Sequence, residues 1–130
     1  VKIPVIVNGD IKTKEDIKKS LLESCADGIM IGRGAYGKPW IINQAMSLLS
    51  TGEFSAEPSN DKKYEIIIDH YDQMISHYGE VVGINLAKKH MSWYSAGLSG
   101  SAEFRARINI TTDIIDTRNL IKDFFQKHFR

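Results

Sequence analysis

The sequence contains very little cysteine, little excess charge and no long apolar run, and each shortage excludes a class of protein. Its one cysteine, Cys25, excludes an internal disulfide and is too few for a thiolate metal site. Seventeen Lys and Arg residues face 16 Asp and Glu residues, so the net charge of +1 gives no evidence for a nucleic-acid partner. Any such partner must be recognised from a local basic cluster.

Targeting and membrane segments are also missing. No apolar run approaches the roughly 18 residues that a membrane-spanning helix needs. The N-terminus lacks the basic, apolar and small-residue pattern of a signal peptide. We therefore expect a cytoplasmic protein with no membrane partner. The chain begins at Val1 directly with a strand-like run, as if an N-terminal portion had been removed.

The first part of the chain alternates strand patterns with helix patterns. β-branched and apolar residues fill 1–7, which predicts a strand buried on both faces, and a second short apolar run covers 27–32. One helix is expected over about 13–24, capped by Thr13, and another begins at Pro39. This order predicts two consecutive β/α units with parallel strands.

The second part of the chain predicts helices only. Residues 53–61 are small, polar and contain proline, as is typical of a linker, so we expect one domain over 1–52 and another over 62–130. Apolar residues then recur at steps of three and four up to a break at Gly79. Three further helices are expected, over about 81–96, 101–109 and 112–128.

The last of these helices is expected to be capped by Thr111 or Thr112. Four helices with short links predict an antiparallel four-helix bundle. The whole chain is therefore expected to be α/β followed by all-α.

Each predicted strand ends in a loop that contains glycine. The two loops are Asn8-Gly9-Asp10 and Gly32-Arg33-Gly34. Backbone N–H groups of such loops, close to a helix N-terminus, favour a bound anion. In TIM (β/α)8 barrels the last two loops form the recurrent phosphate site, and here a different domain follows at once. We therefore predict the last two β/α units of such a barrel.

A simpler interpretation is that these glycines only turn the chain and that Arg33 forms a weak surface ion pair. Two successive loops with an arginine between glycines favour the phosphate interpretation. Arg33 would then add a charge-assisted hydrogen bond to the phosphate.

A local basic cluster lies between residues 83 and 109. Only one acidic residue, Glu103, accompanies four basic ones there: Lys88, Lys89, Arg105 and Arg107. On a helical wheel both lysines face outward, and Lys89 precedes Trp93 by four residues. Basic side chains beside an aromatic suit a phosphate backbone and unstacked bases.

The alternative is a solvated lysine pair beside a core tryptophan. Arg107 has an i,i+4 partner in Glu103, so Arg105 is the better candidate for RNA binding. The same wheel places Ser95 on the outward arc and His90 among the core residues. The histidines have no spacing typical of a metal site, and we expect no metal.

Two long runs in the first half carry a family resemblance. The run IPVIVNGDI, followed by ADGIMIGRGAYGKPW, closely resembles the end of the catalytic barrel in tRNA-dihydrouridine synthases of the bacterial branch B type. In the second half HYDQMISHYG, GINLAKKHMSWYSAGLSG and the arginine in EFRARI resemble that family's C-terminal helical domain. The resemblance covers nearly the whole chain.

The resemblance implies an FMN enzyme that uses NADPH to reduce the C5–C6 bond of uridines in tRNA. Asn8, Gly9 and Asp10 match its first FMN-binding loop, and Gly32 with Arg33 match its second, whereas Gly34 only shapes the turn. The helical half would bind tRNA through four side chains, those of Lys88, Lys89, Trp93 and Arg105.

The family's proton-donating cysteine, with a lysine and a histidine at the flavin, belongs to earlier parts of the barrel that would precede Val1. No catalytic residue is therefore expected in this chain, which should be inactive alone. Cys25 lies just before the last strand and is expected to be a small, partly buried side chain.

Two other functions stay open. One is a stand-alone RNA-binding or interaction module with a vestigial phosphate site, and the other is a different phosphate-binding barrel enzyme with an unrelated helical tail. Two parallel strands cannot bury both faces or close a sheet, so apolar side chains and strand edges would stay exposed. We therefore expect the chain to self-associate through its strands.

Overall fold

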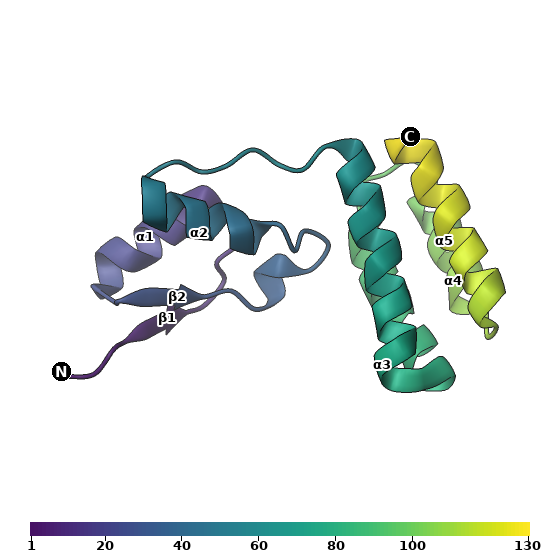
Figure 1. The fold of residues 1–130 in the computed structure, drawn as a ribbon, viewed down its shortest axis with the longest axis horizontal. Helices are drawn as coiled ribbons and strands as arrows, with labels where there is room; N and C mark the ends of the chain where they lie inside the picture. The colour runs from purple at the N-terminus through teal and green to yellow at the C-terminus, as the bar shows by residue number, and fades with distance from the viewer. The chain divides into compact units, whose positions relative to one another are not determined.

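The structure, a computed structural model, describes residues 1–130 as two compact units, Val1–Glu57 and Pro58–Arg130 (Figure 1). The first unit contains β1 (Ile6–Asn8), α1 (Lys14–Ser24), β2 (Gly28–Met30), a short 3-10 helix η1 (Arg33–Ala35) and α2 (Ile41–Thr51). The second unit contains α3 (Asn60–Tyr94), α4 (Ser101–Asn109) and α5 (Ile114–Phe129). None of the helices combines the length and apolarity needed to cross a membrane.

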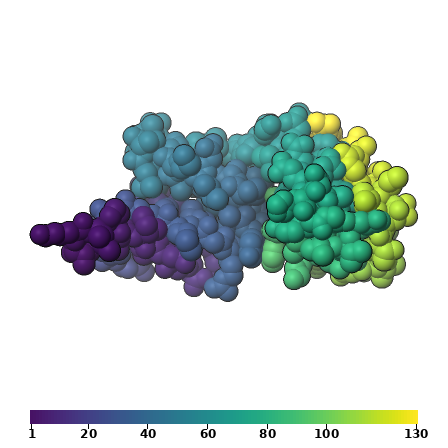
Figure 2. Space-filling model, turned by 60° about the horizontal axis from the view of Figure 1, so that its bottom comes forward, coloured from purple at the N-terminus to yellow at the C-terminus, as the bar shows by residue number.

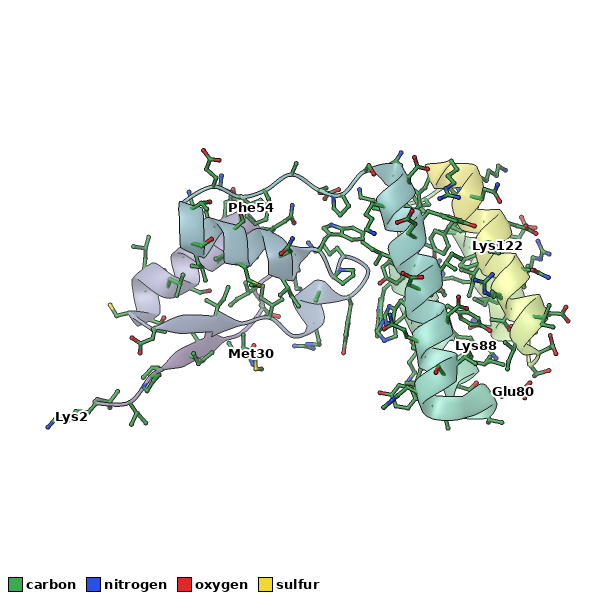
Figure 3. All side chains as sticks on the ribbon, viewed as in Figure 1. Lys2, Met30, Phe54, Glu80, Lys88 and Lys122 are labelled. Atoms are coloured by element: carbon green, nitrogen blue, oxygen red, sulfur yellow. The ribbon has the colours of Figure 1, made fainter.

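The two strands of the first unit pair in parallel, as predicted, with Val7 opposite Ile29. Both helices pack on one face of this pair. They bury a core formed by Ile11, Ile17, Ala45 and Leu48, against which Leu21, Ile29, Ile31 and Phe54 pack. The other face is open, and in Figure 3 Met30 points away from α1 and α2.

The prediction of a strand buried on both faces is therefore wrong for β1. Ile6 is 56% exposed because α1 and α2 cover the same face of the sheet. The residues before β1 are exposed as well, and Figure 2 shows this N-terminal segment, in dark purple, projecting from its unit. The expectation that two strands leave apolar side chains exposed is confirmed.

The capping prediction for α1 is confirmed. Thr13 Oγ1 accepts a hydrogen bond from the N–H of Asp16 at 3.1 Å, and Asp16 Oδ2 accepts one from the N–H of Thr13 at 3.0 Å. The same carboxylate oxygen accepts the N–H of Lys12 at 2.9 Å. The hydrogen bond from Lys12, followed by those from Thr13, lowers the pKa of Asp16.

The predicted break at Gly79 is also found. Gly79 has φ 78° and ψ 176°, a left-handed conformation that interrupts α3 and divides it into two helical segments. Together with α4 and α5 this unit has four helical segments, as the apolar pattern predicted. Their arrangement as an antiparallel bundle, like the barrel origin of the first unit, stays a prediction.

Asp113 caps α5, so the prediction of a threonine cap is wrong. Its Oδ1 accepts hydrogen bonds from the N–H groups of Ile115 at 2.8 Å and Asp116 at 2.9 Å. Thr111 instead donates its hydroxyl to the carbonyl of Ile108 at 2.7 Å, at the end of α4. Thr111 therefore bonds to the end of α4, and the carboxylate of Asp113 caps α5.

Helices α3, α4 and α5 pack on a shared core. Its most deeply buried large side chains are Ile67, Tyr71, Met91, Ile108, Ile121 and Phe125. A bidentate ion pair also joins α5 to α3, with Arg118 Nε and Nη2 each 2.8 Å from a carboxylate oxygen of Asp72. These contacts hold α5 against the first segment of α3.

Candidate functional site

The loops that follow β1 and β2 enclose one cavity of about 210 Å³. Its lining consists of Asn8, Gly9, Asp10, Ile11, Gly32, Arg33 and Gly34. The parallel register explains this meeting, because Asn8 lies opposite Met30 and both strands therefore end at the same edge. The structure thus brings all five residues of the predicted phosphate site around one space.

The backbone at this cavity suits an anion. The N–H groups of Asp10 and Gly32 donate no hydrogen bond within the protein. A Cβ added at Gly9 or Gly32 would meet no atom within 4 Å, so both glycines leave space for close approach. The cavity is several times the ~30 Å³ of one water molecule in the liquid. The arrangement can therefore accept a phosphate group on backbone donors.

Arg33 lines this cavity and forms a weak ion pair with Asp10. Its Nη2 is 3.9 Å from Asp10 Oδ1, and both side chains are strongly exposed. Such a pair contributes little to stability, so a bound phosphate can compete for the guanidinium. The alternative role considered from the sequence, a surface ion pair, is therefore present in the structure beside the cavity.

Cys25 lies at the other end of α1 from the cavity loops and is exposed. The prediction of a partly buried thiol is wrong, because Cys25 takes the left-handed C-cap position of α1 with φ 51°. Its Sγ approaches only the carbonyl of Leu22, at 3.8 Å. Cys25 therefore takes no part in the cavity.

Two of the residues predicted to bind RNA are exposed together on the second segment of α3. Lys89 is exposed, and Trp93, one turn further along the helix, is 38% exposed. The indole ring of Trp93 meets the ring of His90 edge-on, with centroids 5.0 Å apart. This places a cation and an aromatic face side by side on one helix.

Lys88, predicted to face outward, is half-buried and forms a solvent-exposed hydrogen bond within the fold. Its Nζ donates a hydrogen bond to the carbonyl of Asn109 at 3.1 Å, at the C-terminal end of α4. Carbonyls at a helix end lack partners and attract cations, so Lys88 caps α4. The first role of Lys88 is therefore structural.

Arg105 is half-buried on α4, and its Nη1 donates to Ser101 Oγ at 3.4 Å. No ion pair joins Arg107 to Glu103, although they are four residues apart.

Ser95 is buried, against the wheel prediction, because α3 ends there and the chain turns towards α4.

A pair of histidines that sequence spacing did not predict lies on α3. The rings of His70 and His90 are 4.6 Å apart, and His70 Nδ1 lies 3.0 Å from the hydroxyl oxygen of Tyr94. Burial lowers the pKa of His70, and burial followed by the charge of His70 lowers that of His90. The two segments on either side of Gly79 bring these distant histidines together. No group of three His, Cys, Asp or Glu side chains is placed to hold a metal ion.

Acidification is expected to destabilise the helical unit through these histidines. Because their pKa values are lowered in the fold, the unfolded chain binds protons first as the pH falls below about 6.5. The melting temperature, followed by circular dichroism between about pH 7.5 and 5, should therefore fall with pH. The double variant His70→Gln/His90→Gln should fall less steeply. The exposed His77→Gln is the control, and equal slopes in all three proteins would contradict the prediction.

The family model for dihydrouridine synthase (Dus) matches residues 1–129. The chain is 48% identical over 125 residues to the "Probable tRNA-dihydrouridine synthase" of Rickettsia bellii and 50% identical over 125 residues to that of Rickettsia typhi. Each match covers 96% of this chain and 38% of the relative. The "tRNA-dihydrouridine synthase B" of Pseudomonas putida is 38% identical over 127 residues, 98% of this chain and 38% of the relative.

The chain thus spans 38% of the length of these curated relatives. The resemblance inferred from the sequence runs is confirmed, because the family match extends over both units. The chain belongs to the dihydrouridine synthase (Dus) family.

Proposed function

We propose that this chain supplies part of the FMN site and the tRNA-binding helices of a tRNA-dihydrouridine synthase, which reduces the C5–C6 bond of uridine with NADPH. The observation that carries the proposal is the single cavity at which the two predicted phosphate loops meet. In this proposal the first unit is the last two β/α units of a TIM barrel. Because the substrate is tRNA, we place the enzyme in the cytoplasm.

The cavity residues bind and orient the cofactor's phosphate. The free N–H groups of Asp10 and Gly32 donate to phosphate oxygens, and Arg33 adds a charge-assisted bond. Gly9 lets the backbone approach the phosphate closely. Bound FMN supplies the redox chemistry, and the protein positions it. Asn8, at the end of β1, completes the first loop.

The helical unit binds tRNA through exposed residues of α3 and the half-buried Arg105 of α4. Lys89 and Arg105 contact the phosphate backbone, and Trp93 stacks on an unstacked base. Lys88 donates a hydrogen bond to the carbonyl of Asn109 and contributes positive charge. We assign these roles by exposure, and Lys89 is the most exposed of the three cations.

A chimera tests the activity directly. This chain replaces the matching 38% of the Rickettsia bellii relative, which is 48% identical to it over that region. We expect the chimera to form dihydrouridine in tRNA in the presence of NADPH, whereas the 130 residues alone form none. A chimera without flavin absorbance would favour an unrelated barrel enzyme. A chimera that binds tRNA but forms no dihydrouridine would favour a stand-alone binding module. Either result would contradict the proposal.

The double variant Lys89→Ala/Arg105→Ala should weaken tRNA binding by the chimera about tenfold and lower the slope of log K against log[salt] by about 1–2. The matched control is Lys62→Ala/Arg130→Ala, which removes the same two residue types in the same unit. Lys62 pairs with Glu65 at 3.0 Å and Arg130 with Asp61 at 3.1 Å, so both cations are already neutralised. Filter binding at several salt concentrations measures both. Equal slopes in the two double variants would contradict an RNA site on α3 and α4.

A further inference from the structure

The two loops of the phosphate cavity are tied together by Lys38, which lies outside the lining. Its Nζ donates a hydrogen bond of 2.7 Å to the carbonyl of Lys12, 26 residues earlier in the chain. Lys12 directly follows Ile11, the last residue of the first loop in the lining. A charged donor thus reaches from the second β/α loop to the end of the first.

The backbone of Lys38 is itself anchored by two hydrogen bonds. Its N–H donates to the carbonyl of Ala35 at 3.1 Å, and its carbonyl accepts from the N–H of Ile41 at 3.1 Å. The backbone of Lys38 is therefore held between η1 and α2, so the side chain starts from a fixed position in the second loop. Lys38 thus links the two segments through one hydrogen bond from a fixed backbone.

A second contact brings the loops together at Gly34. A Cβ on Gly34 would lie 1.9 Å from the carbonyl oxygen of Ile11, far closer than any side chain allows. Gly34 is buried, and a side chain at this position would have to displace the backbone of the first loop. On the far side of the first loop, Asp16 accepts the N–H groups of Lys12 and Thr13. The end of the first loop is therefore held from both sides.

We propose that Lys38 is a positioning residue for the phosphate site, which sets the spacing between the two loops together with the close packing of Gly34 on Ile11. The proposal rests on the proposed FMN function. A phosphate that accepts donors from both loops needs them at a fixed separation, and preorganised donors bind more tightly than mobile ones. Lys38 itself does not line the cavity, so it acts through the loops.

Two flavins separate this role from a general loss of structure. FMN and riboflavin share the ring system and the ribityl chain, and only FMN has the phosphate. In the chimera, Lys38→Met should weaken FMN binding about tenfold and leave riboflavin binding within about twofold of the parent. Lys38→Arg, which keeps a charged donor, should retain the preference for FMN. Lys18→Met removes an exposed lysine of α1 and is the control.

Gly34→Ala provides a second, independent variant, because its Cβ forces the loops apart. It should lose the FMN preference as Lys38→Met does. Flavin fluorescence quenching measures both affinities, and circular dichroism checks the fold. Equal losses for FMN and riboflavin, an unchanged preference in Lys38→Met, or a Lys38→Arg variant that behaves like Lys38→Met would overturn the proposal. A parent chimera with no preference for FMN would instead overturn the proposed function.

Discussion

Replacing Tyr71 with alanine is expected to lower the free energy of unfolding of the helical unit by about 3–5 kcal/mol. Tyr71 is 0% exposed, and its hydroxyl donates to the carbonyl of Ile114 at 2.8 Å. Burial raises the pKa of Tyr71 to about 12, as expected of a phenol removed from water. The variant loses a large buried ring and leaves a cavity between α3 and α5. Urea denaturation followed by circular dichroism measures the change.

The chain offers a matched control seven residues further along α3. Tyr78 is 51% exposed, so Tyr78→Ala should change the free energy of unfolding by no more than about 0.5 kcal/mol. Tyr71→Phe keeps the ring and removes only the hydrogen bond, which should cost about 1 kcal/mol. An equally small change in the free energy of unfolding for Tyr71→Ala and Tyr78→Ala would contradict the packing of α3 on α5 through Tyr71.

Self-association of the purified 130 residues is the second large effect that we expect. The two-stranded sheet has unpaired edges and an open apolar face that includes Ile6 and Met30. Such edges pair with other chains, and each apolar side chain that becomes buried contributes about 1.5–3 kcal/mol. Light scattering coupled to gel filtration should give a mass well above that of one chain. The mass should increase with protein concentration.

Ile6→Lys should shift this equilibrium towards the monomer, because a lysine on an edge strand opposes strand pairing. Leu22→Lys is the control, since Leu22 is 80% exposed on α1 and lies outside the sheet. It removes as much apolar surface and should leave the mass unchanged. A monomeric parent chain, or a control that dissociates as readily as Ile6→Lys, would contradict association through the strands.

Local features of the fold were predictable because their causes lie within a few residues of one another. Thr13 and Asp16 form the capping box within one helical turn, and Gly79 breaks α3 where only glycine accepts the backbone angles. The prediction of a threonine cap for α5 is wrong because three neighbouring residues can each cap a helix N-terminus. Thr111 bonded to α4 and Asp113 took the cap. Propensity alone does not decide such a competition.

Helical wheels predicted which residues share an arc but not which arc is covered. The wheel placed both Lys88 and Lys89 on the outward arc, yet only Lys88 meets the end of α4. Ser95 is buried because the helix ends there, which a wheel does not represent. The site in the first unit was more accessible to prediction, because parallel strands place their following loops at one edge whatever the surrounding residues are.

The sequence by itself determined the start of α1, the break at Gly79, the parallel pair of strands, the family and five of the residues that line the cavity. These depend on short-range hydrogen bonding, apolar period and contiguous motifs. Only the tertiary structure decided which face of β1 is open, that Lys88 is held by Asn109, that His70 meets His90, and that Lys38 reaches Lys12. Each of those three contacts joins residues at least 20 positions apart, where the path of the chain through space sets the distance.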